Sequence, residues 1–499
     1  MLARHDWITP TLGGQPWLEK PIFYYWQAMV AYKIFGVSDW AARLPSAVDA
    51  TLMVIAVFVF LRRLRPGLEL DGALITASAL GVIGFARAAS MDMPLAATFA
   101  IAMLAWYAWH ESQSKTSLAI FYVFVALGTL AKGPIAPFLA AAVVIAFAIT
   151  QKNFRIVFQT LWIPGVLIYL LVALPWYIAV QLHNPEFFRV FILEHNFSRF
   201  GTNRYHHPQP IWFYVPVVII ALLPWAIFAI AALAETMRAW WAARRSTRQP
   251  EDTLSFFLAI WFVLPVVFFS LSQSKLPGYI LPAMPAGTLL LAVYMRGRNQ
   301  SDKRSSLILV ILHSVMAALL PSLALILQAI VIWHRIILNP AGIFAIVITI
   351  VLSLAIGLTL RSRPGLRLLR FVTLVPVILA IAAVLRLDGH FLDERFSTRP
   401  LSENINRIDN ASLPTAVFQV SREIEYGLHF YRNQPIARYE SGEVPAGEHI
   451  LVAPHAHTIR EINQKLPGRR VSYLGSDQPQ HLDYFWVSPP GMTMDHMRM

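Results

Sequence analysis

The sequence predicts a polytopic α-helical membrane protein that ends in a small α/β domain, and three observations support this. Hydrophobic residues make up 57% of the 499 residues and charged residues only 14%, whereas soluble domains carry about 25% charged residues. About a dozen apolar runs are long enough to cross a bilayer. From about Asp388 onward the chain becomes polar, and short strand and helix patterns alternate.

The apolar runs predict about 12 transmembrane helices. One set of connecting loops carries most of the Lys and Arg residues, which identifies that set as cytoplasmic by the positive-inside rule. The opposite set is then extracytoplasmic. The predicted helices cover residues 46–61, 72–86, 93–110, 117–132, 134–150, 161–181, 211–233, 254–272, 279–295, 306–333, 340–360 and 371–387.

Residues 1–45 precede the first predicted span and mix aromatic with polar residues. Residues 22–35 are apolar but short and contain Lys33, which fits an interfacial helix better than a span. An even number of spans places both termini outside, yet no signal peptide is visible. We therefore expect a further transmembrane helix upstream of Met1.

The remaining chain divides into a transmembrane domain, residues 46–387, and an extracytoplasmic α/β domain, residues 388–499 with a disordered tail at 489–499. The alternation of strand and helix patterns is typical of a small α/β fold. The predicted strands cover residues 416–420, 450–453 and 471–474, and the predicted helices cover 421–431 and 457–466.

The formal net charge of +13 does not indicate nucleic-acid binding. The basic residues lie in short clusters between spans, as cytoplasmic loops require, and form no long basic stripe. The chain has no cysteine, which excludes disulfides, thiolate metal sites and cysteine nucleophiles.

The polar residues that suggest chemistry lie at the ends of the apolar runs, nearly all on the predicted outer face. A channel or transporter would more often place ionisable groups at mid-depth. This distribution favours an enzyme that works at one face of the membrane. The residues concerned are Glu19, Lys20, Asp92, Lys132, His206, His207 and Lys275.

The segment DWITPTLGGQPWLEKP, residues 6–21, is the first candidate. Lys20 could bind a lipid phosphate as a point charge, and Glu19 could bind a metal or a cationic group. Alternatively, Trp17 and Lys20 are interfacial anchors at headgroup level. Asp92 is either a carboxylate that contacts substrate or a helix N-cap ahead of Pro94.

Two loops supply further candidates. His206 and His207 lie in the long loop 182–210, but adjacent histidines are a weak signal and the spacing of a structural zinc site is absent. A catalytic metal could instead combine His207 with Glu19, and the alternative is a polar loop over a pocket. Lys275 and Tyr279 could face a phosphate, or could be a snorkelling Lys and an interfacial Tyr.

Two other polar groups are interpreted as structural. The tripeptide Lys132-Gly133-Pro134 is a tight break between two short spans, which gives Lys132 a topological role. His455 and His457 are expected in a loop at a strand end, without a metal.

The chain resembles the lipid-dependent C-type glycosyltransferases of the protein O-mannosyltransferase and aminoarabinose (lipid A) transferase superfamily. The matching segments follow one another in family order on one membrane face. The outer α/β domain is most similar in layout to that of the aminoarabinose transferases. These segments are DWITPTLGGQPWLEKP, SDWAARLPSA (38–47), RAASMDMPLA (87–96), LAKGP (130–134), EHNFSRF with HHPQPIWFY (194–214), and SKLPGYILPAMP (274–285).

The resemblance implies an inverting transfer of a sugar, such as aminoarabinose or mannose, from a polyprenyl-phosphate carrier. The acceptor would be a hydroxyl or phosphate on lipid A, a glycan or a protein, at the periplasmic face of the bacterial cytoplasmic membrane. Asp92 and Glu19 would be the catalytic carboxylates of this chain. The donor and acceptor would be bound by Lys20, Tyr279, Lys275, His206 and Trp17.

The resemblance further implies a possible divalent cation, zinc or similar, held by Glu19 and His207. It also places the family's principal acidic motif upstream of Met1, and none of Asp6, Glu19 or Asp92 occupies that motif. Two other functions remain open at this point. One is a transporter or flippase for a lipid-linked substrate, and the other is a non-catalytic relative that keeps the fold.

Overall fold

The computed structural model describes most of the chain and divides it into two compact units. The first unit comprises residues 1–11, 16–329 and 334–380, and the second comprises residues 12–15, 330–333 and 381–499. The described residues are all except 13, 192–208, 243–249, 301–305, 334–339, 363–364, 410–412, 456–461, 463–465, 467–468 and 490–499.

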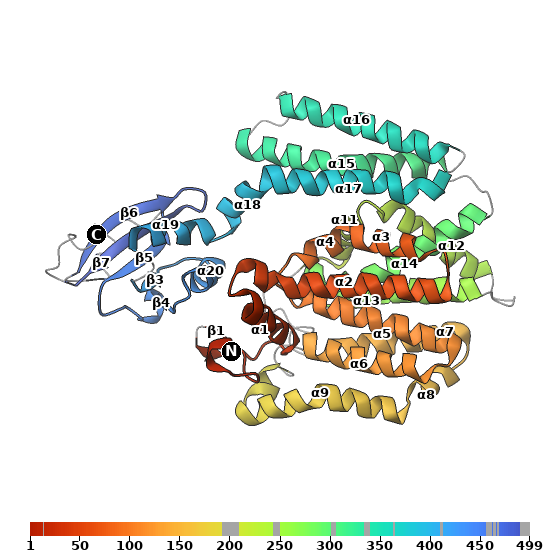
Figure 1. Cartoon of the computed structure of the whole chain (residues 1–499), viewed down its shortest axis with the longest axis horizontal. Coiled ribbons are helices and arrows are strands. Elements are labelled where there is room, and N and C mark those ends of the chain that lie inside the picture. Colours follow the sequence, from red (N-terminus) through yellow and green to blue (C-terminus); the bar gives the residue numbers. More distant parts are fainter. Residues whose placement is uncertain are drawn as a thin grey trace. The chain divides into compact units, whose positions relative to one another are not determined.

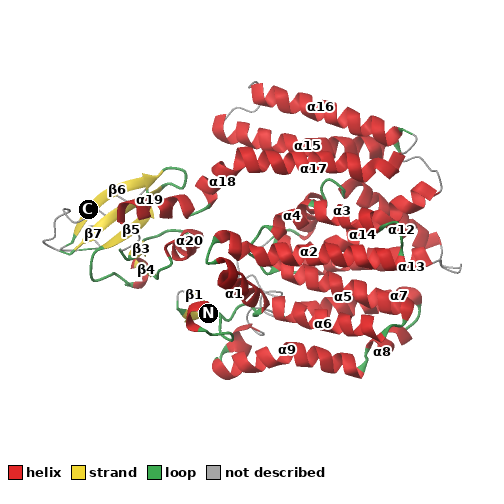
Figure 2. Ribbon diagram, in the orientation of Figure 1, coloured by secondary structure: helices red, strands yellow, loops and turns green. Residues whose placement is uncertain are grey.

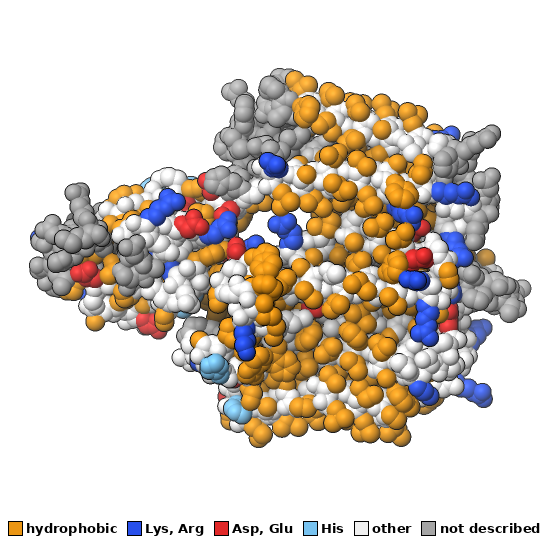
Figure 3. Space-filling view, in the orientation of Figure 1, with side chains coloured by type: hydrophobic (Ala, Val, Ile, Leu, Met, Phe, Trp, Pro, Cys, Tyr) orange, Lys and Arg blue, Asp and Glu red, His pale blue; other side chains and the backbone are white. Residues whose placement is uncertain are grey.

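The first unit is a bundle of helices packed side by side (Figures 1 and 2). Apolar side chains cover its flank, and Lys and Arg gather toward one end of the helices, at the right in Figure 3. Its helices are α1 (Phe23–Phe35), α2 (Asp39–Leu64), α3 (Glu69–Ser78), α4 (Leu80–Ala86), α5 (Asp92–Ser112), α6 (Lys115–Lys132), α7 (Ile135–Gln151), α8 (Arg155–Thr160), α9 (Ile163–His183), α11 (Tyr214–Ala221), α12 (Ala226–Ala242), α13 (Pro250–Ser270), α14 (Met284–Gln300), α15 (Leu307–Trp333), α16 (Pro340–Arg361) and α17 (Leu369–Ala383).

The chain is a multi-pass membrane protein, as its sequence predicts. Among the described residues, seven helices are long and apolar enough to cross a bilayer, and two bent helix pairs raise this number to nine. Every segment predicted as a span coincides with one of these helices or pairs, with a shorter apolar helix, or with α5. Residues 22–35, predicted as an interfacial helix, form α1.

Helix α5 forms the centre of the bundle, which explains why its composition differs from that of a lipid-facing span. It contacts α2 and α6 closely, and 14 of its residues are buried. Trp106 stacks on Phe257 with ring centroids 5.4 Å apart and meets Phe147 edge-on at 5.7 Å. Such aromatic contacts add about 0.5–1.5 kcal/mol each to the energy of burial. They hold α5, α7 and α13 together toward the end of α5 that lies away from Asp92.

Two spans are broken rather than straight, a feature that the hydrophobic pattern does not predict. α3 and α4 meet at 64°, and the segment from Ile211 through α11 meets α12 at 117°. The breaks interlock, because Leu80 N donates to Leu223 O at 2.9 Å and the Trp225 indole donates to Ser78 Oγ at 3.0 Å. These bonds satisfy polar groups that would otherwise be unpaired inside the bundle.

The second unit contains a five-stranded sheet of order β4-β3-β5-β7-β6, shown with helices α18 (Gly389–Phe396), α19 (Arg399–Asp409) and α20 (Arg422–Arg432) in Figure 2. β3 pairs in parallel with β4 and β5, whereas β7 pairs antiparallel with β5 and β6. Apolar cores lie on both faces of the sheet. The strands are β3 (Thr415–Val417), β4 (Ile436–Arg438), β5 (His449–Pro454), β6 (Arg470–Asp477) and β7 (Leu482–Ser488).

The sequence predicts β3, β5, β6 and α20 to within a few residues, but it misses β4 and β7. β4 has only three residues, too few to show an alternating pattern. β7 is buried at every position, so it shows no alternation either. The predicted helix 457–466 and the tail lie largely outside the described residues.

Candidate functional site

The centre of the candidate site is an ion pair between the ends of two buried helices. Asp92 is the first residue of α5, Lys132 is the last residue of α6, and the Lys132 ammonium contacts Asp92 Oδ1. The same ammonium lies over the ring of Tyr279, 4.7 Å from its centroid, in cation–π geometry. The side chains of Asp92 and Lys132 are 21% and 17% exposed. A charged pair of this kind is shielded from bulk water and still open to a ligand.

Two glycines lie beside this pair, one packed on Asp92 and the other directly after Lys132. A methyl group at Gly278, in the 3₁₀ helix η4 (Pro277–Ala283), would lie 2.5 Å from Asp92 Cγ. The Asp92 carboxyl therefore packs directly on the backbone of the segment that carries Tyr279. Gly133, which ends α6, has a φ of +84°, and a methyl group there would lie 2.6 Å from Phe191 Cζ. Both approaches require glycine.

The loop that presents Asp92 is tied to α2. Asp92 N donates to Ser90 Oγ at 3.4 Å, and Ser46 Oγ donates to Ser90 O at 3.4 Å. Ser46 is fully buried in α2. The position of Asp92 thus depends on α2 as well as on its own helix.

The segment that contains Glu19 and Lys20 packs beside the same helix ends. Phe23, three residues after Lys20, contacts the cluster formed by Leu95 of α5 and Ala131 of α6. Leu18 packs against the apolar cluster at the end of α9. Burial and the negative charge of Glu19 raise the pKa of Tyr25.

Residues 6–10 and Trp17 are held by hydrogen bonds within the chain. Asp6 Oδ1 accepts from the backbone of Ile8 at 2.9 Å and of Thr9 at 3.0 Å. Burial raises the pKa of Asp6, but these bonds outweigh it and the net pKa is lowered. Trp17 N donates to Pro10 O at 2.7 Å, which closes the turn ahead of Glu19. Hydrogen bonds within the chain therefore fix the conformation of this segment.

Lys275 is buried, and its ammonium donates to Gln209 O at 2.9 Å and to Ser272 O at 2.6 Å. Tyr214 OH donates to Leu276 O at 3.1 Å on the same loop. These contacts favour a role for Lys275 in holding residues 272–278 in place. A direct contact between Lys275 and a phosphate stays a prediction.

The predicted metal pair is only partly described. His206 and His207 lie outside the described residues, whereas Glu19 lies within them. Within the part of the chain that the structure describes, no three His, Asp or Glu side chains gather in a group that could hold a metal.

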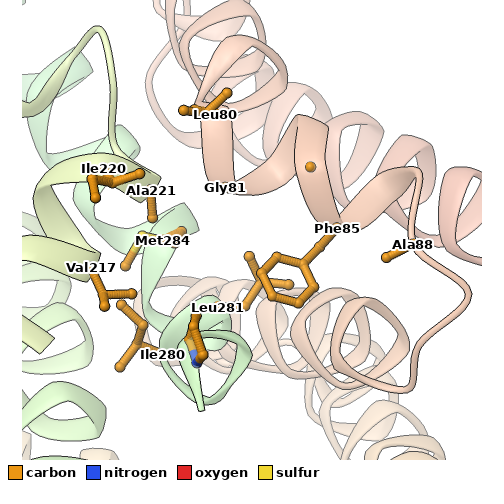
Figure 4. Close-up of a pocket in the computed structure, with 12 residues that line it drawn as sticks. Leu80, Gly81, Phe85, Ala88, Val217, Ile220, Ala221, Ile280, Leu281 and Met284 are labelled. Carbon is orange, nitrogen blue, oxygen red and sulfur yellow. The ribbon is translucent and has the colours of Figure 1, made fainter. Parts of the chain in front are cut away.

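An apolar pocket of about 280 Å³ adjoins the site between the two broken spans (Figure 4). Pro277, which lines it, precedes the glycine that contacts Asp92, and Ala88 lies four residues before Asp92. The lining of the pocket is apolar throughout, which suits a segment of hydrocarbon chain. Its lining consists of Leu80, Gly81, Gly84, Phe85, Ala88, Val217, Ile220, Ala221, Pro277, Ile280, Leu281 and Met284.

The structure corrects the interpretation of Lys132 as purely topological. Its charge is paired with Asp92 and placed on Tyr279. The sequence contains a signal for this role, because Gly133-Pro134 ends the helix directly after Lys132. The position of the Lys132 charge along the bundle is therefore fixed. That signal gives no partner, however, and the pairing with Asp92 depends on how α5 and α6 pack.

Comparisons with known proteins identify relatives of this chain in sequence and in fold. Residues 19–178 match the family model described as dolichyl-phosphate-mannose-protein mannosyltransferase. An undecaprenyl phosphate-α-4-amino-4-deoxy-L-arabinose arabinosyl transferase of Pseudomonas fluorescens (strain Pf0-1) is 29% identical over 66% of this chain and 57% of the relative. The corresponding enzyme of Sodalis glossinidius is 33% identical over 61% of this chain and 54% of its own. The chain is therefore similar in sequence to transferases that use lipid-linked sugars, and it spans just over half the length of these relatives.

A solved structure has the same fold over nearly the whole chain. The crystal structure of ArnT from Cupriavidus metallidurans bound to undecaprenyl phosphate superposes with a TM-score of 0.76 at 20% identity, covering 97% of this chain and 91% of that one. The same protein in the apo state gives 0.75. In sequence, the chain matches 57% of the length of the first curated relative.

Proposed function

We propose that this chain is a glycosyltransferase that moves a sugar from a polyprenyl-phosphate carrier to an acceptor on lipid A. The observation that supports the proposal most directly is the ion pair between Asp92 and Lys132, whose ammonium also lies over the Tyr279 ring. The pair brings a carboxylate and a cation together at the ends of two membrane helices. Aminoarabinose is the proposed sugar, because the curated relatives carry it in their names.

The reaction would be a single displacement at the anomeric carbon. An acceptor oxygen forms a bond to that carbon, and the bond from the carbon to the phosphate oxygen breaks with its electron pair left on the phosphate. The sugar's configuration is therefore inverted. The leaving polyprenyl phosphate gains a negative charge, so it needs cations more than it needs a proton donor.

Lys20 and Lys132 would supply that positive charge, and the hydroxyl of Tyr279 would donate to the phosphate. Asp92 would accept a hydrogen bond from the acceptor hydroxyl and take its proton as the new bond forms. Lys132 would then serve both partners, since its ammonium pairs with the Asp92 carboxyl and would face the leaving group. Glu19 would contact the sugar or a cation beside it.

The proposed setting is the periplasmic face of the bacterial inner membrane. Asp92 and Lys132 lie at helix ends joined by loops poor in Lys and Arg, which the positive-inside rule assigns to the outer face. A polyprenyl carrier and lipid A are both available in that leaflet.

The test is transfer by the purified full chain in lipid vesicles. The donor is undecaprenyl phosphate linked to aminoarabinose, the acceptor is lipid A, and mass spectrometry detects the product. We expect lipid A to gain the mass of one sugar, and Asp92→Asn to lower the rate. Failure of the wild-type chain to modify lipid A, with intact donor recovered, would contradict the proposal.

A further inference from the structure

A second carboxyl, which the proposed mechanism does not use, lies inside the first span. Asp49 belongs to α2, which is long and apolar enough to cross the membrane, and only 4% of its surface is exposed. No Lys, Arg or His of the described residues forms an ion pair with it. An isolated charge in such surroundings is strongly unfavourable, so the state of Asp49 needs a physical explanation.

The hydrogen bonds of Asp49 leave two buried oxygen atoms without a donor from the described part of the chain. Gln27 of α1 donates from Nε2 to Asp49 Oδ1 at 2.9 Å. The two remaining polar atoms of this pair, Asp49 Oδ2 and Gln27 Oε1, are buried and have no hydrogen-bond partner among the described residues. When Asp49 is ionised, both of these atoms are acceptors and neither can satisfy the other.

A single proton placed between these two atoms would satisfy both of them. A carboxylic acid and a primary amide are complementary, because the amide N–H donates to the carbonyl oxygen while the acid O–H donates to the amide oxygen. The hydroxyl of Tyr24, which also faces α2, donates to Ala42 O at 2.5 Å and is therefore not the missing donor. The proton on Asp49 Oδ2 would remove two unpaired buried acceptors and one buried charge.

We propose that Asp49 and Gln27 form a neutral acid–amide pair that fixes α1 on α2 and thereby positions the two halves of the candidate site. α1 directly follows Glu19 and Lys20. One turn before Asp49, Ser46 holds the loop that presents Asp92. Two adjacent turns of α2 thus contact both halves of the site: Asp49 contacts α1, and Ser46 contacts the loop before Asp92. The positioning role rests on the proposed function, whereas the protonation state does not.

The protonation state is tested by infrared difference spectroscopy of the full chain in lipid vesicles at neutral pH. Asp49→Asn keeps the shape of the side chain and removes the acid. We expect the wild type to show the carbonyl band of a protonated carboxyl group that the Asp49→Asn variant lacks. Absence of that band would overturn the neutral pair and would mean that Asp49 is ionised and solvated by buried water.

The positioning role is tested by kinetics of the same vesicles. Asp49→Asn should retain kcat within about twofold, since its amide can pair with Gln27, whereas Asp49→Leu should lower kcat by about 10- to 100-fold through displacement of α1. The exchanged pair, Gln27→Glu with Asp49→Asn, rebuilds an acid–amide pair and should also keep kcat within about twofold of the wild type. A kcat unchanged by Asp49→Leu would overturn the positioning role.

The two proposals fail in different ways. If the wild-type chain transfers no sugar, the proposed function fails, and the infrared band still decides the state of Asp49. Thermal unfolding then replaces kinetics: Asp49→Leu should unfold at a lower temperature than Asp49→Asn, and the exchanged pair should unfold close to the midpoint of the wild type. Equal midpoints for all three variants would overturn the pair as a contact between α1 and α2.

Discussion

At the scale of single residues, the site is defined by a charge pair whose members come from different helices. The sequence indicates Asp92 as a candidate because it begins a helix at the outer face. It cannot indicate that Lys132 is the partner, because 39 intervening residues separate the two and only the packing of α5 on α6 brings them together. The same limit applies to Gly278, whose contact with Asp92 comes from a distant loop.

The contact at Gly278 gives a sharp prediction. Gly278→Ala should lower the rate of sugar transfer by at least about tenfold, because the new methyl group would occupy the position of the Asp92 carboxyl and displace it. Gly297→Ala is the matched control, since a methyl group there meets nothing within 4 Å and Gly297 does not line the pocket. Initial transfer rates of the two variants in vesicles decide the matter. Equal rates would mean that the position of Asp92 is not critical.

At the scale of elements, helix composition follows from the environment that each helix meets. α5 is surrounded by protein and rich in Trp, Tyr and Ala, whereas α9 and α16 expose many apolar side chains. The sequence predicts these helices well, because an apolar segment in the bilayer must form its backbone hydrogen bonds internally, as a helix. It does not predict the breaks in α3–α4 and α11–α12, whose unpaired groups are satisfied by each other.

The N-cap of α2 can be tested on its own. Ser38 Oγ accepts from Ala41 N at 3.2 Å, so Ser38→Ala should lower the free energy of unfolding by about 0.5–2 kcal/mol. Thr51→Ala, on an exposed part of the same helix, should change it by less than about 0.5 kcal/mol. Denaturation of the protein in mixed micelles provides both values. A similar loss for the two variants would argue against the cap.

At the scale of the whole molecule, the sequence predicts the broad plan better than the site. The bundle follows from apolar runs, and the second unit follows from the change in composition near Asp388. Strand order does not follow from the sequence, because β4 and β5 both pair with β3 through contacts that no local pattern encodes. His206 and His207 lie outside the described residues, so their roles stay predictions.

Shortening a buried side chain in the core of the second unit should destabilise this unit as it would a soluble domain. Ile450 is fully buried in β5, and Ile450→Ala should destabilise this unit by about 2–5 kcal/mol through lost packing and a new cavity. Tyr473→Phe, at a half-exposed position in β6, is the control and should have little effect. Hydrogen exchange of the β5 amides in the full chain measures the difference. Unchanged protection in Ile450→Ala would contradict the described core.

The most direct test of the central claim is a double-mutant cycle on sugar transfer. The claim is that Asp92 and Lys132 act as one unit in the reaction. Asp92→Asn, Lys132→Met and the double variant are compared with the wild type in vesicles, with kcat/KM as the measured quantity. We predict that each single change lowers kcat/KM by about 10²-fold or more and that the double change costs little beyond either one. Losses that multiply in the double variant would show that the two residues act independently and would contradict the account.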